Sequence, residues 1–131
     1  MILYLKTAGS SCELWLAQNI GSKSVKYEWE AGRELACGLL KFIRECLHEQ
    51  GADWQNVKGI GVFEGPGSFT SLRIGTTVAN TLASSENVPI IGARGNDWLK
   101  TVQEKLAAGE SYDIVLPFYG GKANVTLPKH R

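Results

Sequence analysis

The fold is decided by one stretch of fifteen residues, GVFEGPGSFTSLRIG, which spans positions 61–75. An apolar run, a tight glycine turn and the start of a helix follow one another within it. Glycines allow positive φ or close backbone approach, Pro66 fixes its own φ, and Ser68 or Thr70 can cap the free amides of a helix. The stretch therefore predicts a strand, a turn and a helix in that order.

Two interpretations of this turn stay open on its residues alone. The first is a purely structural strand-to-helix connection. The second is a phosphate cradle, because helix N-termini bind anions. The stretch has neither the lysine of a GxxxxGK[ST] loop nor the GxGxxG pattern of dinucleotide-binding folds, so a catalytic phosphate loop is not expected.

Working outward, apolar patterning predicts a meander of three strands, followed by helices and strands in alternation. Alternation of this kind favours parallel pairing of the later strands through right-handed crossovers. The predicted fold is thus α/β, in the order βββαβαβα, with a mixed sheet and helices on its faces. The expected strands cover residues 1–5, 12–17, 25–30, 57–63 and 88–92, and the expected helices cover 33–50, Ser68 or Thr70 to residue 85, and 96–108.

The composition indicates one domain without a dominant charge. The chain has 131 residues, 44% of them apolar, and a net charge of +1, which provides no global field for nucleic acid or an anionic membrane. Its apolar runs are far shorter than a bilayer span and its start lacks the features of a signal peptide, so we expect a soluble, cytoplasmic protein. Three cysteines without a CxxC pair predict reduced thiols rather than disulfides or a zinc site.

Over its full length the stretch at 61–75 closely resembles the motif GxGPGSFTxLRIG of the TsaB/YeaZ family. The similarity extends to the opening MILYLKT, which resembles MILAIDTS, and to VPIIGARGNDWL, which resembles VPLVGVSSLEAL. The resemblance implies one lobe of the actin, sugar-kinase and Hsp70 ATPase superfamily, a ribonuclease H-like fold, over residues 1–110. Residues 112–127 resemble the opening hairpin of a second lobe, so 111–131 is expected to be a remnant of that lobe with a basic tail. The family motif comprises Gly65, Pro66, Gly67, Ser68, Phe69, Thr70, Leu72, Arg73 and Gly75.

The resemblance also implies a function, in the synthesis of threonylcarbamoyladenosine in tRNA. Family members pair with the catalytic subunit TsaD, to which the ATPase TsaE is added. This chain is therefore expected to be a scaffold or activator subunit that contacts tRNA only indirectly. Family members build a four-helix bundle with TsaD or with a second copy through the two helices that flank the motif. The expected partner interface consists of Ala36, Leu40, Leu47, Leu72, Gly75, Val78, Ala79 and Leu82.

Several departures from the family point away from chemistry on this chain. Lys6 stands where the family's first strand carries an aspartate, and an ammonium does not coordinate Mg²⁺. The two histidines, His48 and His130, cannot assemble a paired-histidine metal motif, and one lobe cannot enclose the nucleotide cleft of two-lobed relatives. We therefore expect no catalytic, cofactor or metal site. The alternatives are a small nucleotide-binding hydrolase or protease-like enzyme, and a homodimeric module with an unrelated partner.

Overall fold

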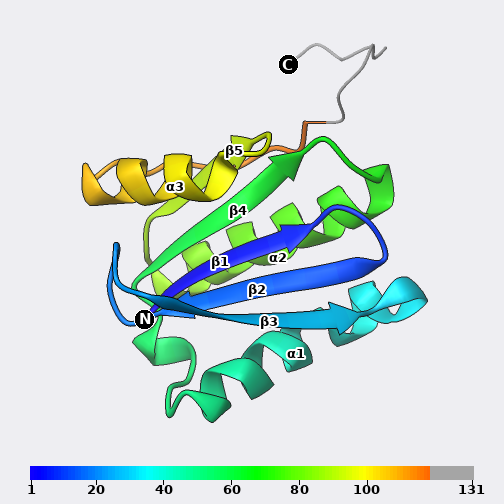
Figure 1. The fold of residues 1–131 in the computed structure, drawn as a ribbon, viewed down its shortest axis with the longest axis horizontal. Helices are drawn as coiled ribbons and strands as arrows, with labels where there is room; N and C mark the ends of the chain where they lie inside the picture. Colours follow the sequence, from blue (N-terminus) through cyan, green and yellow to red (C-terminus); the bar gives the residue numbers. More distant parts are fainter. Residues whose placement is uncertain (119–131) are drawn as a thin grey trace.

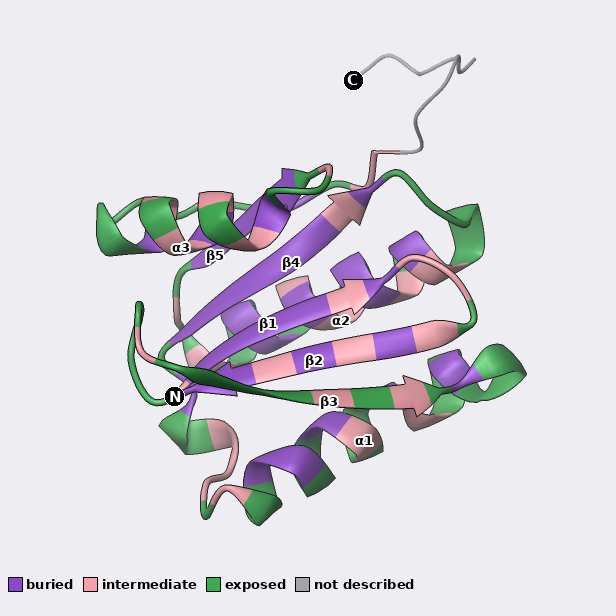
Figure 2. Cartoon of the chain, in the orientation of Figure 1, coloured by how far each residue is buried: buried purple, intermediate pink, exposed green. Residues whose placement is uncertain are grey.

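Two apolar strands, β1 (Ile2–Thr7) and β4 (Gly59–Gly65), lie at the centre of a five-stranded sheet in the computed structural model, which describes residues 1–118. Nearly every side chain of both strands is buried, as expected for strands that are covered on both faces. The strands pair in parallel, with Ile2 opposite Gly59. They form the platform on which the helices pack (Figures 1 and 2).

The sheet has the order β3-β2-β1-β4-β5 and is mixed, as predicted. The hairpin partners β2 (Ser11–Ala17) and β3 (Ser24–Glu30) run antiparallel, and β5 (Ile90–Arg94) runs parallel to β4. Burial alternates along β2 and falls away along β3 (Figure 2), because helices cover only one face of this half of the sheet. β3 is therefore the exposed edge of the described sheet.

Helices α1 (Leu35–Glu49) and α2 (Phe69–Glu86) lie next to each other on one face, and α3 (Trp98–Ala107) covers β4 and β5 on the other (Figure 1). The predicted order βββαβαβα is confirmed, with two local differences. A 3-10 turn, Gly32–Glu34, precedes α1, and a second, Trp54–Asn56, delays β4. Among helices of residues 1–118, none combines the length and apolarity that crossing a bilayer requires.

Two tryptophans meet in the core on the α3 side of the sheet. Trp15 is partly buried at the margin of this core, whereas Trp98 is 3% exposed. Trp98 starts α3 and packs edge-to-face against both Trp15 and Phe63, with ring centroids 5.6 Å apart in each pair. Trp98 lies near the start of the helix expected at 96–108, and the helix turns this side chain into the core.

Residues 111–118 form no strand, and they lie as an extended strap over the lobe. The side-chain amide of Asn80 holds both backbone groups of Val115, donating to its carbonyl at 2.8 Å and accepting from its amide at 2.9 Å. Val115 itself is 1% exposed. The rest of the hairpin predicted for 112–127, and the basic residues Lys122, Lys129, His130 and Arg131, lie outside the described residues. The division of the chain at residue 110 stays a prediction.

Gly75 sets how closely α2 approaches the sheet. A side chain there would collide with the Oγ1 of Thr7 on β1. The same hydroxyl donates to the carbonyl of Ser71 at 2.7 Å, one turn earlier on α2. The small residue therefore serves the packing of the helix on its own sheet, and the place of Gly75 in a partner interface stays a prediction.

Replacing Gly75 with alanine should lower the free energy of unfolding by about 1–3 kcal/mol, since the added methyl overpacks a well-filled site. Urea denaturation measures the loss. Gly9→Ala is the control because a methyl at Gly9 would meet no atom within 4 Å. Equal stability of the two variants would contradict the proposed close contact.

The three cysteines are free thiols, and only Cys37 is exposed. Burial raises the pKa of Cys12 to about 12 and that of Cys46 to about 11. Both buried thiols therefore resist forming the reactive thiolate near neutral pH.

A thiol reagent such as DTNB at pH 8 should label Cys37 rapidly and leave the other two cysteines unlabelled until the chain unfolds. Cys37→Ser should abolish the rapid phase. Rapid labelling of Cys12 or Cys46 in the folded protein would show that the core on the α1 side opens readily.

Candidate functional site

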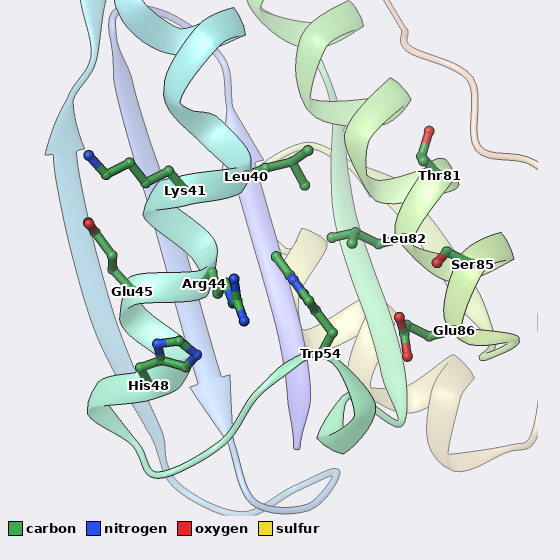
Figure 3. Close-up of a pocket in the computed structure, with 10 residues that line it drawn as sticks. All are labelled: Leu40, Lys41, Arg44, Glu45, His48, Trp54, Thr81, Leu82, Ser85 and Glu86. Atoms are coloured by element: carbon green, nitrogen blue, oxygen red, sulfur yellow. The ribbon is translucent and has the colours of Figure 1, made fainter.

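The surface between α1 and α2 carries the largest hollow among those described here, about 640 Å³ in volume (Figure 3). It arises because α1 packs on the sheet through one stripe, Leu35, Leu39 and Ile43, which turns the next row of side chains toward α2. The row on α1 begins at Leu40. Ten residues line the hollow: Leu40, Lys41, Arg44, Glu45, His48, Trp54, Thr81, Leu82, Ser85 and Glu86.

The centre of this hollow is apolar and its rim is charged. In Figure 3 Leu40 on α1 and Leu82 on α2 point toward each other, with the indole of Trp54 between the helices. Leu40 is 48% exposed. Lysine, arginine and histidine side chains of α1 line one wall, and Glu86 of α2 lines the other.

A polar cluster around Asp53 fixes Trp54 to α1. The guanidinium of Arg44 donates to both carboxylate oxygens of Asp53, at 3.2 and 3.3 Å, and the Nε2 of His48 lies 3.2 Å from one of them. The amide of Trp54 donates to the same carboxylate at 2.8 Å, and the backbone amide of Asp53 donates to the side-chain oxygen of Asn56 at 2.9 Å in a capping box. Hydrogen bonds from Arg44, Trp54 and His48 hold the pKa of the Asp53 carboxyl well below its usual range.

A second, shallower hollow of about 320 Å³ continues between the same helices toward their N-terminal ends. The guanidinium of Arg73 lies 5.5 Å from the ring centroid of Phe69, at the start of α2. We call the two hollows together the α1/α2 groove. The lining of the second comprises Ala36, Thr70, Arg73, Ile74, Thr77 and Val78.

The residues expected at a partner interface divide into two sets. Leu40 and Leu82 line the larger hollow, and Ala36 and Val78 line the smaller one. The other four, which are buried within the chain, are Leu47, Leu72, Gly75 and Ala79.

The glycine turn uses its polar groups within the chain. The amide of Ser68 donates to the carbonyl of Ala8 at 2.8 Å, and the Ser68 hydroxyl accepts from the amide of Ser71 as a helix cap. The Ser71 hydroxyl donates to the carbonyl of Gly9 at 2.9 Å. These contacts join the turn to the β1–β2 hairpin, so the structural interpretation of the motif accounts for its serines. Of the motif, Gly65, Leu72 and Gly75 are buried, while Pro66, Gly67, Ser68, Phe69, Thr70 and Arg73 are exposed.

Lys6 lies at the end of β1, where its ammonium is 4.6 Å from the centroid of the Phe63 ring. A hollow beside it is lined by Lys6, Glu13 and the hairpin turn 8–11. Within residues 1–118 no group of three or more histidine, cysteine or acidic side chains is placed to hold a metal ion. His48 is exposed; His130 lies beyond the described part of the chain.

Sequence reasoning missed Trp54 and the basic residues Arg44 and His48 as parts of the groove. The only available signal was the row Leu40, Arg44 and His48, which recurs every four residues beside the buried stripe of α1. Trp54 gave no local signal, because its place depends on contacts between Asp53 and a helix nine residues earlier in the chain.

Comparisons with known proteins agree with this fold. Residues 29–127 match the family model described as TsaD, tRNA N6-adenosine threonylcarbamoyltransferase. The tRNA threonylcarbamoyladenosine biosynthesis protein TsaB of Escherichia coli K12 is 32% identical over 93 residues, 70% of this chain and 38% of that protein. TsaB of Buchnera aphidicola is 34% identical over 93 residues, 70% of this chain and 41% of that protein.

A solved structure titled YeaZ from Pseudomonas aeruginosa superposes with a TM-score of 0.64 and 28% identity, covering 71% of this chain and 43% of that one. The predicted resemblance to TsaB/YeaZ proteins and the predicted actin-like, ribonuclease H-like fold are therefore confirmed. The chain spans about two fifths of the length of these TsaB and YeaZ relatives.

Asp53→Asn should destabilise the protein at neutral pH, because the Asp53 carboxylate is held ionised by its partners. A depressed carboxyl pKa stabilises the fold above the unfolded value of about 3.9 and loses that effect as the pH falls through the folded value. The stability difference between the wild type and Asp53→Asn, measured by urea titration, should thus shrink below about pH 4.

Glu104→Gln, at an exposed carboxylate of α3, is the control and should change stability little. A difference for Asp53→Asn that stays constant down to pH 2 would contradict the role given to its charge.

Proposed function

The chain belongs to the family described as TsaD, tRNA N6-adenosine threonylcarbamoyltransferase, and its relatives include TsaB and YeaZ proteins. We propose that it acts in the biosynthesis of threonylcarbamoyladenosine in tRNA. In this proposal the chain is a non-catalytic scaffold or activator subunit. It binds a TsaD-like catalytic subunit in the cytoplasm, with a TsaE-like ATPase in the larger assembly. It contacts tRNA only through these partners.

The α1/α2 groove is the observation that carries this proposal. A partner helix that lies between two helices buries apolar side chains at spacings of three and four residues. Leu40, Trp54 and Leu82 offer an apolar centre for such a helix, and the charges of Arg44 and Glu86 on opposite walls favour one orientation of it. A second copy of the chain is the competing occupant of the same groove.

The absence of chemistry from this subunit is part of the proposal and rests on two features. The strand end that would present a carboxylate to a metal carries Lys6, whose ammonium lies over an aromatic ring. The serine hydroxyls of the glycine turn make hydrogen bonds within the chain, at Ser68 and Ser71. No contact in residues 1–118 favours the hydrolase or protease alternative over a binding role.

Leu40→Asp should weaken binding to the TsaD-type protein of the same organism by about tenfold or more, since it places a charge at the centre of an apolar contact. Calorimetry or co-purification with that protein measures the effect. Ile114→Asp is the matched control, because Ile114 is 58% exposed on the strap and lies outside the groove.

Both variants should retain the wild-type circular dichroism spectrum and melting temperature within a few degrees. If the wild type forms no complex with the TsaD-type protein, or if Leu40→Asp and Ile114→Asp bind equally well, the proposal fails.

A further inference from the structure

The outer edge of β3 has no strand partner in residues 1–118 (Figure 1). β3 is seven residues long, pairs with β2 along its whole length, and carries mostly exposed side chains (Figure 2). An open edge of this kind presents a row of unpaired amides and carbonyls, which is a template for another strand. What could pair with it is decided by the sequence SVKYEWE of residues 24–30.

The hydrogen bonds to β2 determine which backbone groups face outward. The amide of Ala31 donates to the carbonyl of Ser10, and the register sets Ser11 opposite Glu30. Backbone groups alternate along an antiparallel strand, so those of Val25, Tyr27 and Trp29 point to β2 as well. The outward groups are therefore those of Ser24, Lys26, Glu28 and Glu30.

We propose that the β3 edges of two copies of this chain pair antiparallel around a twofold axis at Tyr27. Centred there, the strand is complementary to itself: Lys26 meets Glu28 of the other copy, and Val25 meets Trp29. All outward backbone groups then face each other in hydrogen-bonded pairs. The two sheets become one sheet of ten strands across the axis, from five in each copy.

The charges select this register over its neighbours. In the neighbouring registers that also bring outward backbone groups together, the twofold axis lies at Lys26 or at Glu28. Each of these registers places that residue directly opposite the same residue of the other copy, so two like charges face each other. Like charges opposed across a strand pair are unfavourable. Only the register centred on Tyr27 combines the full overlap of seven residues with two oppositely charged pairs.

Two like charges that lie opposite each other inside each copy favour the same partner. Glu13 on β2 lies directly opposite Glu28 on β3, so two carboxylates face each other on the open side of the sheet. Lys26 reaches toward both, with its Nζ 3.4 Å from Glu13 and 3.9 Å from Glu28. The proposed pairing adds a second cation, the Lys26 of the other copy, on the far side of Glu28.

The other face gains apolar contact. Val25 is 44% exposed, whereas Trp29, at the other end of β3, stacks on Phe42 of α1 with centroids 5.2 Å apart. In the proposed pair each Val25 is covered by the Trp29 of the other copy. Because only a seven-residue edge is joined, the interface is small and the dimer is weak and reversible.

This inference does not rest on the proposed function, since the α1/α2 groove lies between other elements and stays open in the dimer. Sedimentation velocity across the micromolar to millimolar range tests it. The wild-type chain should dimerise with increasing concentration. Lys26→Glu and Glu28→Lys, each alone, should raise the dissociation constant by about tenfold, because each turns both cross-copy ion pairs into repulsions.

Two further samples identify the register. An equimolar mixture of Lys26→Glu and Glu28→Lys should form heterodimers, since every charge then meets its opposite. The double variant carrying both changes should regain the wild-type dissociation constant. Ile114→Asp, on the strap and outside both β3 and the groove, is the control and should leave self-association unchanged.

The inference is overturned if the wild-type chain sediments as a monomer at all concentrations, whatever the reason that β3 does not pair. It is also overturned by a dimer that Leu40→Asp disrupts and the charge reversals do not, because that dimer would use the groove. Binding to a TsaD-type protein by a monomeric wild type would overturn this inference and leave the proposed function standing.

Discussion

The close contact between α2 and β1 is the constraint on which the remaining structure depends. Gly75 brings the helix against Thr7, and the Thr7 hydroxyl binds the first turn of the same helix. At its N-terminus α2 is tied to the hairpin turn through Ser68 and Ser71. The position of α2 is thus fixed at two points along its length, and this fixed helix forms one wall of the groove.

The other wall depends on a different principle. The apolar stripe of α1 packs on the sheet. The row of Arg44 and His48 beside this stripe binds the segment that follows the helix. Arg44 and His48 hold Asp53, and Asp53 in turn holds Trp54 beside the apolar centre. The groove therefore combines a wall set by backbone packing with a wall set by a polar cluster, and the second is the one whose shape depends on ionisation.

The sequence predicted the order of elements because β1 and β4 are apolar runs and α1 has a regular stripe, signals that are local. Of the residues expected at a partner interface, Leu40 and Val78 line the groove, whereas Gly75 and Ala79 are buried. A row of small residues marks close approach without indicating whether the neighbour is the chain's own sheet or another protein. Trp54 could not be placed at all, because its position follows from side-chain contacts of Asp53 with Arg44 and His48 that no apolar periodicity indicates.

The strap at 111–118 is held mainly through its backbone. Asn80 binds the amide and the carbonyl of Val115, and neither bond depends on which side chains flank that residue. Only the small buried pocket for Val115 restricts its identity. Positions such as Ile114 and Leu116 can therefore diverge during evolution without loosening the lobe, so this segment can acquire new surface chemistry at little cost to the fold.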